Sequence, residues 1–441
     1  MTKVIACACA LLFRGITAAW GETVCERPSG VGWVENRRGL KIVHLSGSFY
    51  DMGRQHAELL KYETKDALRA IKSTIRKEKR WVPIPLLMWY IRLSVHKKQE
   101  PHIASEFKQE MKGGADASGV CLRRIQELHA LTYLTSCAGA AAWGEATRDG
   151  SLCFMKSNDT YFTIDHRRKK TIHPIVMVYH PADGAAFITI SWPGYVGVGG
   201  GVNEHGIVVG NLNINSSRER PGGVPMIFRV KNTLLRARTL DQAVELLTAK
   251  PLAGGYSFIV GHGPSRSARV IEMDADSVYV GTWDGPAESN QYEHRGREYS
   301  YNPVRGLLVR TNHPLSSEVF ANYQSTIDSE SGKPCFTGPR YRELKQEYRR
   351  QWGGLTADSL LLTVRRVYRD IGKEGTGCHA VSTHQYAVAP EHDRLLLAVS
   401  GGDALRENGE YLSSAYNQAV MEFSIDSLLN APPPFAGGSG Q

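Results

Sequence analysis

The sequence predicts an α+β protein in which antiparallel sheets are covered by helices. Three observations support this fold class. Apolar residues have mainly helical spacing over 51–135, strand patterns dominate after Cys137, and helical patterns return at 225–249, 340–352 and 356–370. The chain has 441 residues, of which 42% are hydrophobic, so it can bury the core of one large domain or of two ordinary ones.

The N-terminus has the pattern of a secretory signal. Lys3 precedes the apolar run VIACACALLF, and small residues follow at 17–19, with Arg14 between them. The apolar run is too short to span a bilayer. We therefore expect a signal peptide over residues 1–19 and a secreted or periplasmic protein.

The helical part begins with a long pattern with few breakers, DMGRQHAELLKYETKDALRAIKSTIRKEKR. The next stretch, WVPIPLLMWYIRLSVHKK, is strongly apolar between basic ends. For its part WVPIPLLMWYIRL, residues 81–93, we favour a buried helix of the outer layer, and the alternative is an element that docks on a membrane with the help of the basic flanks. In LRRIQELHALTYL, one helical face is expected to carry Leu122, Ile125, Leu128 and His129.

Paired strand patterns follow Cys137. AAAWGEAT and SLCFMKSND predict a hairpin around Asp149-Gly150, and HPIVMVYHP with AAFITISWP predicts a second hairpin. GGGVNEHG is expected to be a turn before the strand IVVGNLNI. Further strands are expected at YSFIVGHG, ARVIEMD and SVYVGTW, and a last hairpin joins VSTHQYAVAP to RLLLAVSGG. Within 225–249, Thr239 and Gln242 predict a capping box, and residues 431–441 predict a disordered tail.

The formal net charge of +9 comes partly from basic clusters at 76–80 and 166–170. Neither cluster is interleaved with stacking aromatics, so we expect solvated faces and no nucleic-acid partner. GYVGVGGGVNEHG does not fit G-x-G-x-x-G, because Val202 and Glu204 occupy the third-glycine positions. G-x-S-x-G is absent from the sequence, which disfavours a serine α/β-hydrolase. The zinc-binding motif H-E-x-x-H is absent as well.

No cofactor or metal is expected. Cys378, His379 and His384 could ligate a metal, but their spacing matches no standard site and strand residues are favoured. Removal of the signal leaves six cysteines without a CxxC pair: Cys25, Cys121, Cys137, Cys153, Cys335 and Cys378. Their disulfide pairing stays open.

Several motifs occur in order along the chain. They are LSGSFYDMGRQHAELL, SCAGAAAWGEATRDG around Cys137, KSND, WPGYVGVGGGVNEHGIVVGNLNI, VRTNHP and GPRYRELK. With these motifs the sequence resembles the family of acyl-coenzyme A:6-aminopenicillanate acyltransferases and their hydrolase relatives, which are self-cleaving N-terminal-nucleophile enzymes of the peptidase C45 type. The resemblance covers about residues 40–410 and implies a four-layer αββα sandwich.

The resemblance implies that the chain cleaves itself between Ser136 and Cys137. The small Ser136 would permit a strained turn in the precursor, and Cys137 would then begin a central strand. The freed α-amine of Cys137 would act as base for its own thiol. Residues 20–136 and 137–430 would form the two chains, which stay associated.

The resemblance also assigns supporting roles. Asp159 would hold the α-ammonium, and Arg340 would favour the thiolate, with Arg342 as a competitor for that role. Asn213 and Asn312 would serve the oxyanion. Cys153 is interpreted as a strand residue, and His56 and His205 as surface histidines.

The implied activity is hydrolysis of a linear amide C–N bond in a small molecule: an acyl-amino acid, a peptide-like compound or a lipid amide. Two alternatives stay open. One is transfer of the acyl group to an amine, which an exported enzyme would seldom perform on acyl-coenzyme A. The other is a non-catalytic secreted binding protein with the same fold. Membrane contact is not favoured.

Overall fold

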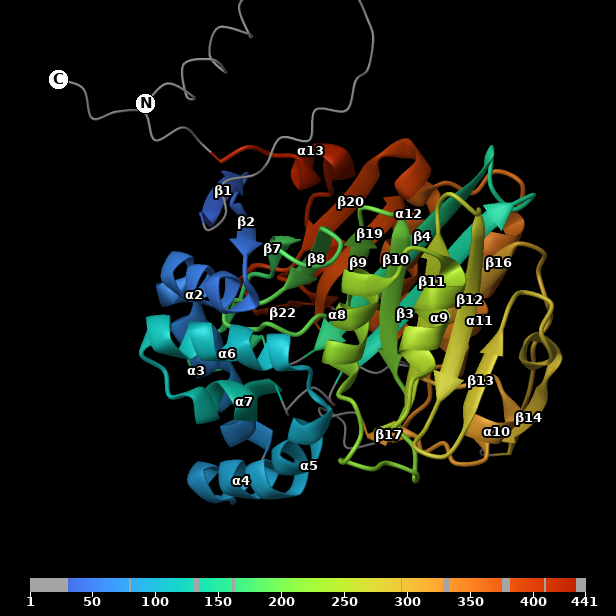
Figure 1. The fold of residues 1–441 in the computed structure, drawn as a ribbon. Coiled ribbons are helices and arrows are strands. Elements are labelled where there is room, and N and C mark those ends of the chain that lie inside the picture. Colours follow the sequence, from blue (N-terminus) through green and yellow to red (C-terminus); the bar gives the residue numbers. More distant parts are fainter. Residues whose placement is uncertain are drawn as a thin grey trace, which may run out of the picture.

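The computed structural model describes residues 31–78, 81–129, 135–160, 163–294, 296–327, 334–374, 381–407 and 410–433. Figure 1 shows two sheets with helices on their outer sides and a group of N-terminal helices at the lower left. The predicted signal peptide, Cys25, Cys378, His379 and most of the predicted tail lie outside the described residues.

The larger sheet has nine strands in the order β1-β2-β7-β8-β9-β10-β11-β12-β13. Strands β2 and β7 run parallel, and the other neighbours run antiparallel. The bounds are β1 Trp33–Arg37, β2 Leu40–Gly47, β7 Ile175–Pro181, β8 Phe187–Ser191, β9 Gly200–Asn203, β10 Ile207–Asn213, β11 Tyr256–His262, β12 Ser267–Met273 and β13 Val278–Gly281.

The smaller sheet has six antiparallel strands in the order β16-β3-β4-β19-β20-β24. The bounds are β3 Thr135–Gly144, β4 Gly150–Thr160, β16 Leu307–Arg310, β19 Ser382–Ala389, β20 Arg394–Val399 and β24 Met421–Ser424. Short ribbons lie outside both sheets: β5 Ile164–Asp165, β6 Lys170–Thr171, β14 Gln291–His294, β15 Arg297–Ser300, β17 Thr326–Ile327, β18 Pro334–Cys335, β21 Gly402–Asp403, β22 Arg406–Glu407 and β23 Glu410–Tyr411.

The helices complete a four-layer arrangement. The helices on the nine-stranded side include α2 Phe49–Leu59, α6 Ser105–Ser118, α8 Met226–Arg236 and α9 Leu240–Thr248, and those on the six-stranded side include α11 Gly338–Arg350 and α12 Ala357–Glu374. Three buried cores lie between successive layers: helices on sheet, sheet on sheet, and sheet on helices. This confirms the predicted αββα sandwich, because each sheet buries both faces.

The other helices are α3 Lys61–Glu78, α4 Ile84–Ile91, α5 Lys97–Gln99, α7 Leu122–His129, α10 Ser317–Phe320 and α13 Ile425–Leu429, together with a π-helical turn at Arg92–His96 and short 3-10 turns at Glu100–His102, Pro286–Ser289, Pro390–His392 and Ala415–Asn417. The prediction that residues 51–135 are mainly helical is confirmed over the part described. The prediction of a buried helix at the segment 81–93 is wrong, because α4 exposes Leu86, Trp89 and Tyr90.

The predicted hairpins are present as β3–β4, β7–β8 and β19–β20. The predicted cap is present too: Thr239 Oγ1 accepts from Gln242 N, while Gln242 Oε1 accepts from Arg238 N. No helix of the described residues is both long enough and apolar enough to cross a membrane.

The prediction that GGGVNEHG forms a turn is wrong in part, because Gly200–Asn203 form strand β9 inside the nine-stranded sheet. A Cβ added at Gly201 would lie 2.2 Å from Ile188 O, and one at Gly200 would lie 2.5 Å from Tyr386 Oη. The glycines therefore allow close approach of neighbouring strands and of the second sheet, rather than a change of chain direction.

Candidate active site

Cys137 is fully buried at the interface of the two sheets. Strand β3 lies between β16 and β4, and Cys137 pairs in register with Asn158 of β4. The strand begins two residues earlier, at Thr135, and Ser136 pairs with Asp159. The strained turn expected at Ser136 is therefore wrong for this chain, because the peptide is held in an extended, paired strand.

The backbone nitrogen of Cys137 is held by Asn312, which follows strand β16. Cys137 N donates to Asn312 Oδ1 at 2.6 Å, and Asn312 Nδ2 donates to Asn213 O at 2.7 Å. Arg340 of α11 donates to the same Asn312 Oδ1 at 3.1 Å and to Cys137 O at 3.2 Å. Because two donors meet at Oδ1, the orientation of the amide is fixed, and Asn312 binds the nitrogen that cleavage would release.

Asn213 ends strand β10 and is buried. Within the described part of the chain, neither its Oδ1 nor its Nδ2 has a hydrogen-bond partner. A buried amide normally has partners, so this one is available to a group that the chain itself does not supply. The arrangement fits the expected role of Asn213 as an oxyanion donor better than it fits that role for Asn312.

Asp159 lies on β4 and is buried beside Arg340. Its Oδ1 accepts from Ser157 Oγ at 2.9 Å, and its Oδ2 lies 3.6 Å from Arg340 Nη1. Burial raises the pKa of Asp159, and the Arg340 charge opposes this rise. Arg340 also stacks on Tyr368 of α12, with 4.9 Å from Cζ to the ring centroid. Arg340 therefore connects Cys137 O and Asn312, which it contacts by hydrogen bonds, to Tyr368 in the helical layer.

Lys156 is a candidate residue that the sequence analysis missed. Its Nζ donates to Asn158 Oδ1 at 3.1 Å and to Asn211 Oδ1 at 3.2 Å, and the side chain is buried. Cys137 Sγ lies 3.8 Å from the same Asn158 Oδ1. Burial lowers the pKa of Lys156, and negative charge on Cys137 and Asp159 raises it. A lysine inside the buried strand pattern CFMKSND was the available signal, because a buried charge needs a partner.

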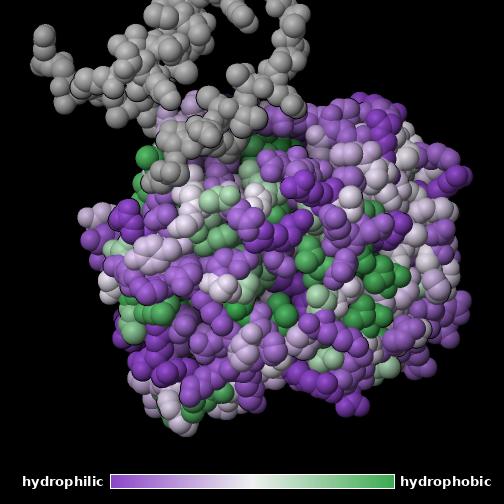
Figure 2. Space-filling model, viewed as in Figure 1, coloured by the Kyte–Doolittle hydropathy of each residue, from purple (hydrophilic) through white to green (hydrophobic). Residues whose placement is uncertain are grey.

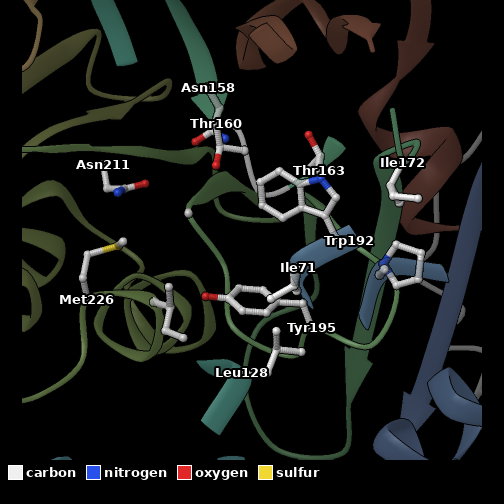
Figure 3. A pocket seen from close by; sticks show the side chains of 14 residues that line it. Ile71, Leu128, Asn158, Thr160, Thr163, Ile172, Trp192, Tyr195, Asn211 and Met226 are labelled. Atoms are coloured by element: carbon white, nitrogen blue, oxygen red, sulfur yellow. The ribbon is translucent and has the colours of Figure 1, made fainter. Parts of the chain in front are cut away.

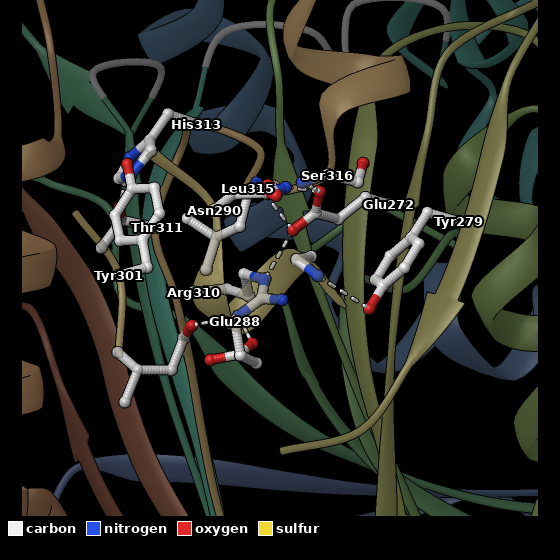
Figure 4. Close-up of polar contacts among 12 residues, drawn as sticks. Glu272, Tyr279, Glu288, Asn290, Tyr301, Arg310, Thr311, His313, Leu315 and Ser316 are labelled. Atoms are coloured by element: carbon white, nitrogen blue, oxygen red, sulfur yellow. Dashed lines mark hydrogen bonds and ion pairs between the residues drawn. The ribbon is translucent and has the colours of Figure 1, made fainter. Parts of the chain in front are cut away.

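Arg342, the proposed competitor of Arg340, is exposed on α11. Arg310 belongs to a separate buried ion cluster, shown in Figure 4, where it donates to Glu272 and Glu288 at 2.6 Å each. The Glu272 carboxylate also accepts from the backbone N–H groups of Leu315 and Ser316. The cluster therefore fixes the loop that follows Asn312.

A cavity that opens to solvent lies beside the site (Figure 3). Asn158, which contacts Cys137 Sγ, lies at its polar end together with Asn211 and Thr160. Most of the remaining wall is apolar, and it is formed by Ala67, Ile71, Leu128, Ile172, Trp192, Pro193, Tyr195, Met226 and Ile227. The cavity thus leads from the surroundings of the thiol into an apolar chamber.

Two buried histidines hold the loop that walls this cavity. His56 Nε2 accepts from Gly194 N, and His129 Nε2 accepts from Val196 N, each at 2.9 Å. Burial lowers the pKa of His56 to about 3 and that of His129 to about 4, so both are neutral acceptors. The prediction of a surface His56 is wrong, whereas His205 is half-buried in a turn.

The other candidates outside this site have ordinary surroundings. Cys153 is a strand residue, as predicted, and burial raises its pKa to about 12. His384 is buried in β19 beside Trp192. In the ranges that the structure describes, no three His, Cys, Asp or Glu side chains gather into a metal-binding group.

Comparison with known proteins confirms the predicted resemblance. Residues 155–333 match the family described as acyl-coenzyme A:6-aminopenicillanic acid acyl-transferase. This segment contains Asp159, Asn213 and Asn312, whereas Cys137 and Arg340 lie outside it.

Three curated proteins are similar in sequence. Protein dcd1B of Dictyostelium discoideum is 23% identical over 90% of this chain and 76% of its own length. Protein dcd1A of the same organism is 27% identical over 62% of each chain. An uncharacterized protein of Archaeoglobus fulgidus is 25% identical over 58% of this chain and 47% of its own length.

Among solved structures, an N-acylethanolamine-hydrolyzing acid amidase ortholog of Caenorhabditis elegans has a TM-score of 0.38 and 14% identity, and covers 65% of this chain and all of its own. Penicillin V acylase of Agrobacterium tumefaciens has a TM-score of 0.36 and 12% identity, and covers 67% of this chain and 94% of its own.

Proposed function

We propose that this chain, which resembles the acyl-coenzyme A:6-aminopenicillanic acid acyl-transferase family over residues 155–333, is a self-processing cysteine hydrolase of linear amides. The observation that carries the proposal is the environment of Cys137. Its nitrogen is bound by Asn312, and its sulfur lies against Asn158, which Lys156 also contacts. A nucleophile and a held leaving nitrogen are the two groups that cleavage of the preceding peptide requires.

In maturation, the Cys137 thiolate attacks the carbonyl carbon of Ser136, and the C–N bond breaks. The nitrogen of Cys137 takes a proton and becomes an α-amine, while Ser136 is held as a thioester. Water then opens the thioester, leaving a carboxylate on Ser136 and a free thiol on Cys137. The contact between Cys137 N and Asn312 Oδ1 supports this step, since it suits the amine as well as the amide.

In turnover, the α-amine accepts the thiol proton, since its ordinary pKa of about 7.7–8.0 lies near neutrality. The thiolate attacks the substrate carbonyl, and the developing oxyanion is placed near the unpartnered amide of Asn213. The substrate amine leaves with a proton, and water hydrolyses the acyl-thioester to a free acid. Arg340 and Asp159 act by holding Asn312 and the Cys137 carbonyl in place.

The substrate class follows from the cavity. Its apolar wall suits an extended or aromatic apolar acyl group. In the described part of the chain, Trp192 Nε1 and Thr163 Oγ1 are buried without hydrogen-bond partners, and both residues line this cavity. They are polar contacts for a substrate that carries an acceptor beyond its scissile amide.

Acyl transfer to an amine is the second candidate, and the description of the matched family favours it. Adding a primary amine acceptor during turnover separates the two activities, because transfer yields a new amide and hydrolysis yields the free acid. We also propose that the chain is exported, which the N-terminal signal pattern supports. Sequencing the N-terminus of the secreted chain tests this, and an intact Met1 would contradict it.

The central experiment is an intact mass spectrum with N-terminal sequencing of the purified protein. We expect two associated fragments, the larger beginning CAGAAAWGE, together with hydrolysis of an acyl amide that carries an apolar acyl group. Cys137→Ala is expected to abolish both cleavage and turnover. The matched control is Cys153→Ala, which removes a second buried cysteine on the adjacent strand and keeps both. A full-length, inactive parent chain after prolonged incubation would favour a non-catalytic binding protein.

A further inference from the structure

Helix α4 and the residues before it expose a group of large apolar side chains. Trp81 is 83% exposed, Leu86 54%, Trp89 57% and Tyr90 59%. Within the described ranges, five of the thirteen exposed large hydrophobic residues lie in the ten positions 81–90. Figure 2 shows hydrophobic surface at the lower edge of the molecule, where Figure 1 places α4. Clusters of this kind mark interaction surfaces, whereas scattered exposed residues do not.

The exposed residues share one side of the helix. Leu86, Trp89 and Tyr90 have the spacing i, i+3, i+4, so their side chains project together. Leu87, Met88 and Ile91 are partly or fully buried on the other side, and α4 contacts α3. The helix is therefore attached to the protein by one face and presents the other outward.

Positive charge surrounds this surface. Residues 76–100 contain seven Lys or Arg and two acidic residues, Glu78 and Glu100. Lys97 and Lys98 are exposed after the helix, and Arg76 and Lys77 are exposed before it. Trp and Tyr favour the boundary between lipid headgroups and acyl chains, and nearby Lys and Arg favour anionic headgroups. A second copy of this chain would bring the same positive charge to the interface, which disfavours self-association.

We propose that α4 and its basic flanks dock this protein peripherally on anionic lipid membranes. The helix has eight residues, which is too short to span a bilayer but sufficient to place one apolar face in the headgroup region. Helix α3 contacts α4 and also supplies Ala67 and Ile71 to the cavity wall. Docking therefore places the lipid surface one helix away from the cavity. The docking itself does not depend on the proposed catalytic activity.

Co-sedimentation of the full chain with vesicles tests the proposal. The vesicles contain phosphatidylcholine alone or phosphatidylcholine mixed with phosphatidylglycerol. We expect the parent protein to sediment with the mixed vesicles and at least about tenfold less with neutral ones, with the binding weakened by salt. Leu86→Ser combined with Trp89→Ser is expected to lower binding at least about tenfold, because it removes two membrane-facing apolar side chains.

Matched pairs of variants serve as controls. Leu362→Ser with Trp352→Ser removes two exposed apolar side chains elsewhere and is expected to leave binding unchanged. Lys97→Glu with Lys98→Glu is expected to abolish the preference for anionic vesicles, whereas Arg349→Glu with Arg350→Glu, an equal charge change on α11, preserves it. Circular dichroism checks that each variant is folded. The proposal would be overturned if the parent does not bind vesicles, or if the Leu86/Trp89 variant binds them as well as the parent does. It would also be overturned if these two substitutions abolish self-association of the protein but leave vesicle binding unchanged.

Discussion

Replacing Lys156 by Met is expected to raise the pKa of the Cys137 thiol. Lys156 Nζ and Cys137 Sγ both contact Asn158 Oδ1, at 3.1 and 3.8 Å. The two atoms therefore lie at most about 7 Å apart, where opposite unit charges interact by about 2.4 kcal/mol at an effective dielectric constant of about 20. That energy corresponds to about 1.7 pKa units, so the thiolate fraction below the midpoint falls about 50-fold.

The assay is inactivation by iodoacetamide as a function of pH, because the alkylation rate follows the thiolate fraction and its midpoint reports the thiol pKa. Lys156→Arg is expected to restore the parent midpoint, since it keeps the charge. The exposed Lys98→Met is a control that leaves the midpoint unchanged. The family resemblance implies that Arg340 stabilises the Cys137 thiolate. However, Arg340 contacts Cys137 O and Asp159, so Arg340→Leu is expected to shift the thiol pKa less than Lys156→Met does. A parent-like midpoint in Lys156→Met, or a larger shift in Arg340→Leu, would refute this reasoning.

Three further predictions concern other parts of the fold. Arg310→Met removes the cation that Glu272 and Glu288 share in their buried cluster. It is expected to lower the free energy of unfolding, measured by urea titration, by about 3–5 kcal/mol. An unchanged free energy of unfolding would contradict this prediction. His56 and His129 are neutral when folded, with pKa values of about 3 and about 4. Their contribution to the free energy of unfolding is complete above the unfolded-state pKa of about 6.5. It is lost as the pH falls from there toward their pKa values in the folded protein, by about 1.4 kcal/mol per pH unit for each imidazole. His129→Gln is expected to reduce this slope by about one proton, and an identical slope would contradict the assignment. Trp192→Ala enlarges the cavity and is expected to raise KM for apolar acyl amides more than it lowers kcat, and unchanged kinetics would remove this residue from the acyl site.

The sequence by itself determined the elements whose signals are local. Continuous apolar runs on each side of the Asp149-Gly150 turn signal predict the β3–β4 hairpin, because both signals lie within a few residues of each other. The cap at Thr239 is likewise encoded within four residues. Cys137, Asp159 and Arg340 could be singled out from motifs, and the structure brings them together although 203 positions separate Cys137 from Arg340.

Only the tertiary structure decided which partner each group has. A helix that is apolar on all sides, such as α4, gives no periodicity from which exposure can be predicted, so its outward face became visible only after its neighbours were placed. Strand β9 is defined by the close approach of Ile188 and Tyr386 to its glycines, which are contacts from other strands. Lys156 becomes a candidate partner of the thiol, and Asn312 a ligand of the Cys137 nitrogen, through contacts across strands. Hydrogen bonds and charge act through space, so their partners are set by the packing of the sheets and not by the order of residues.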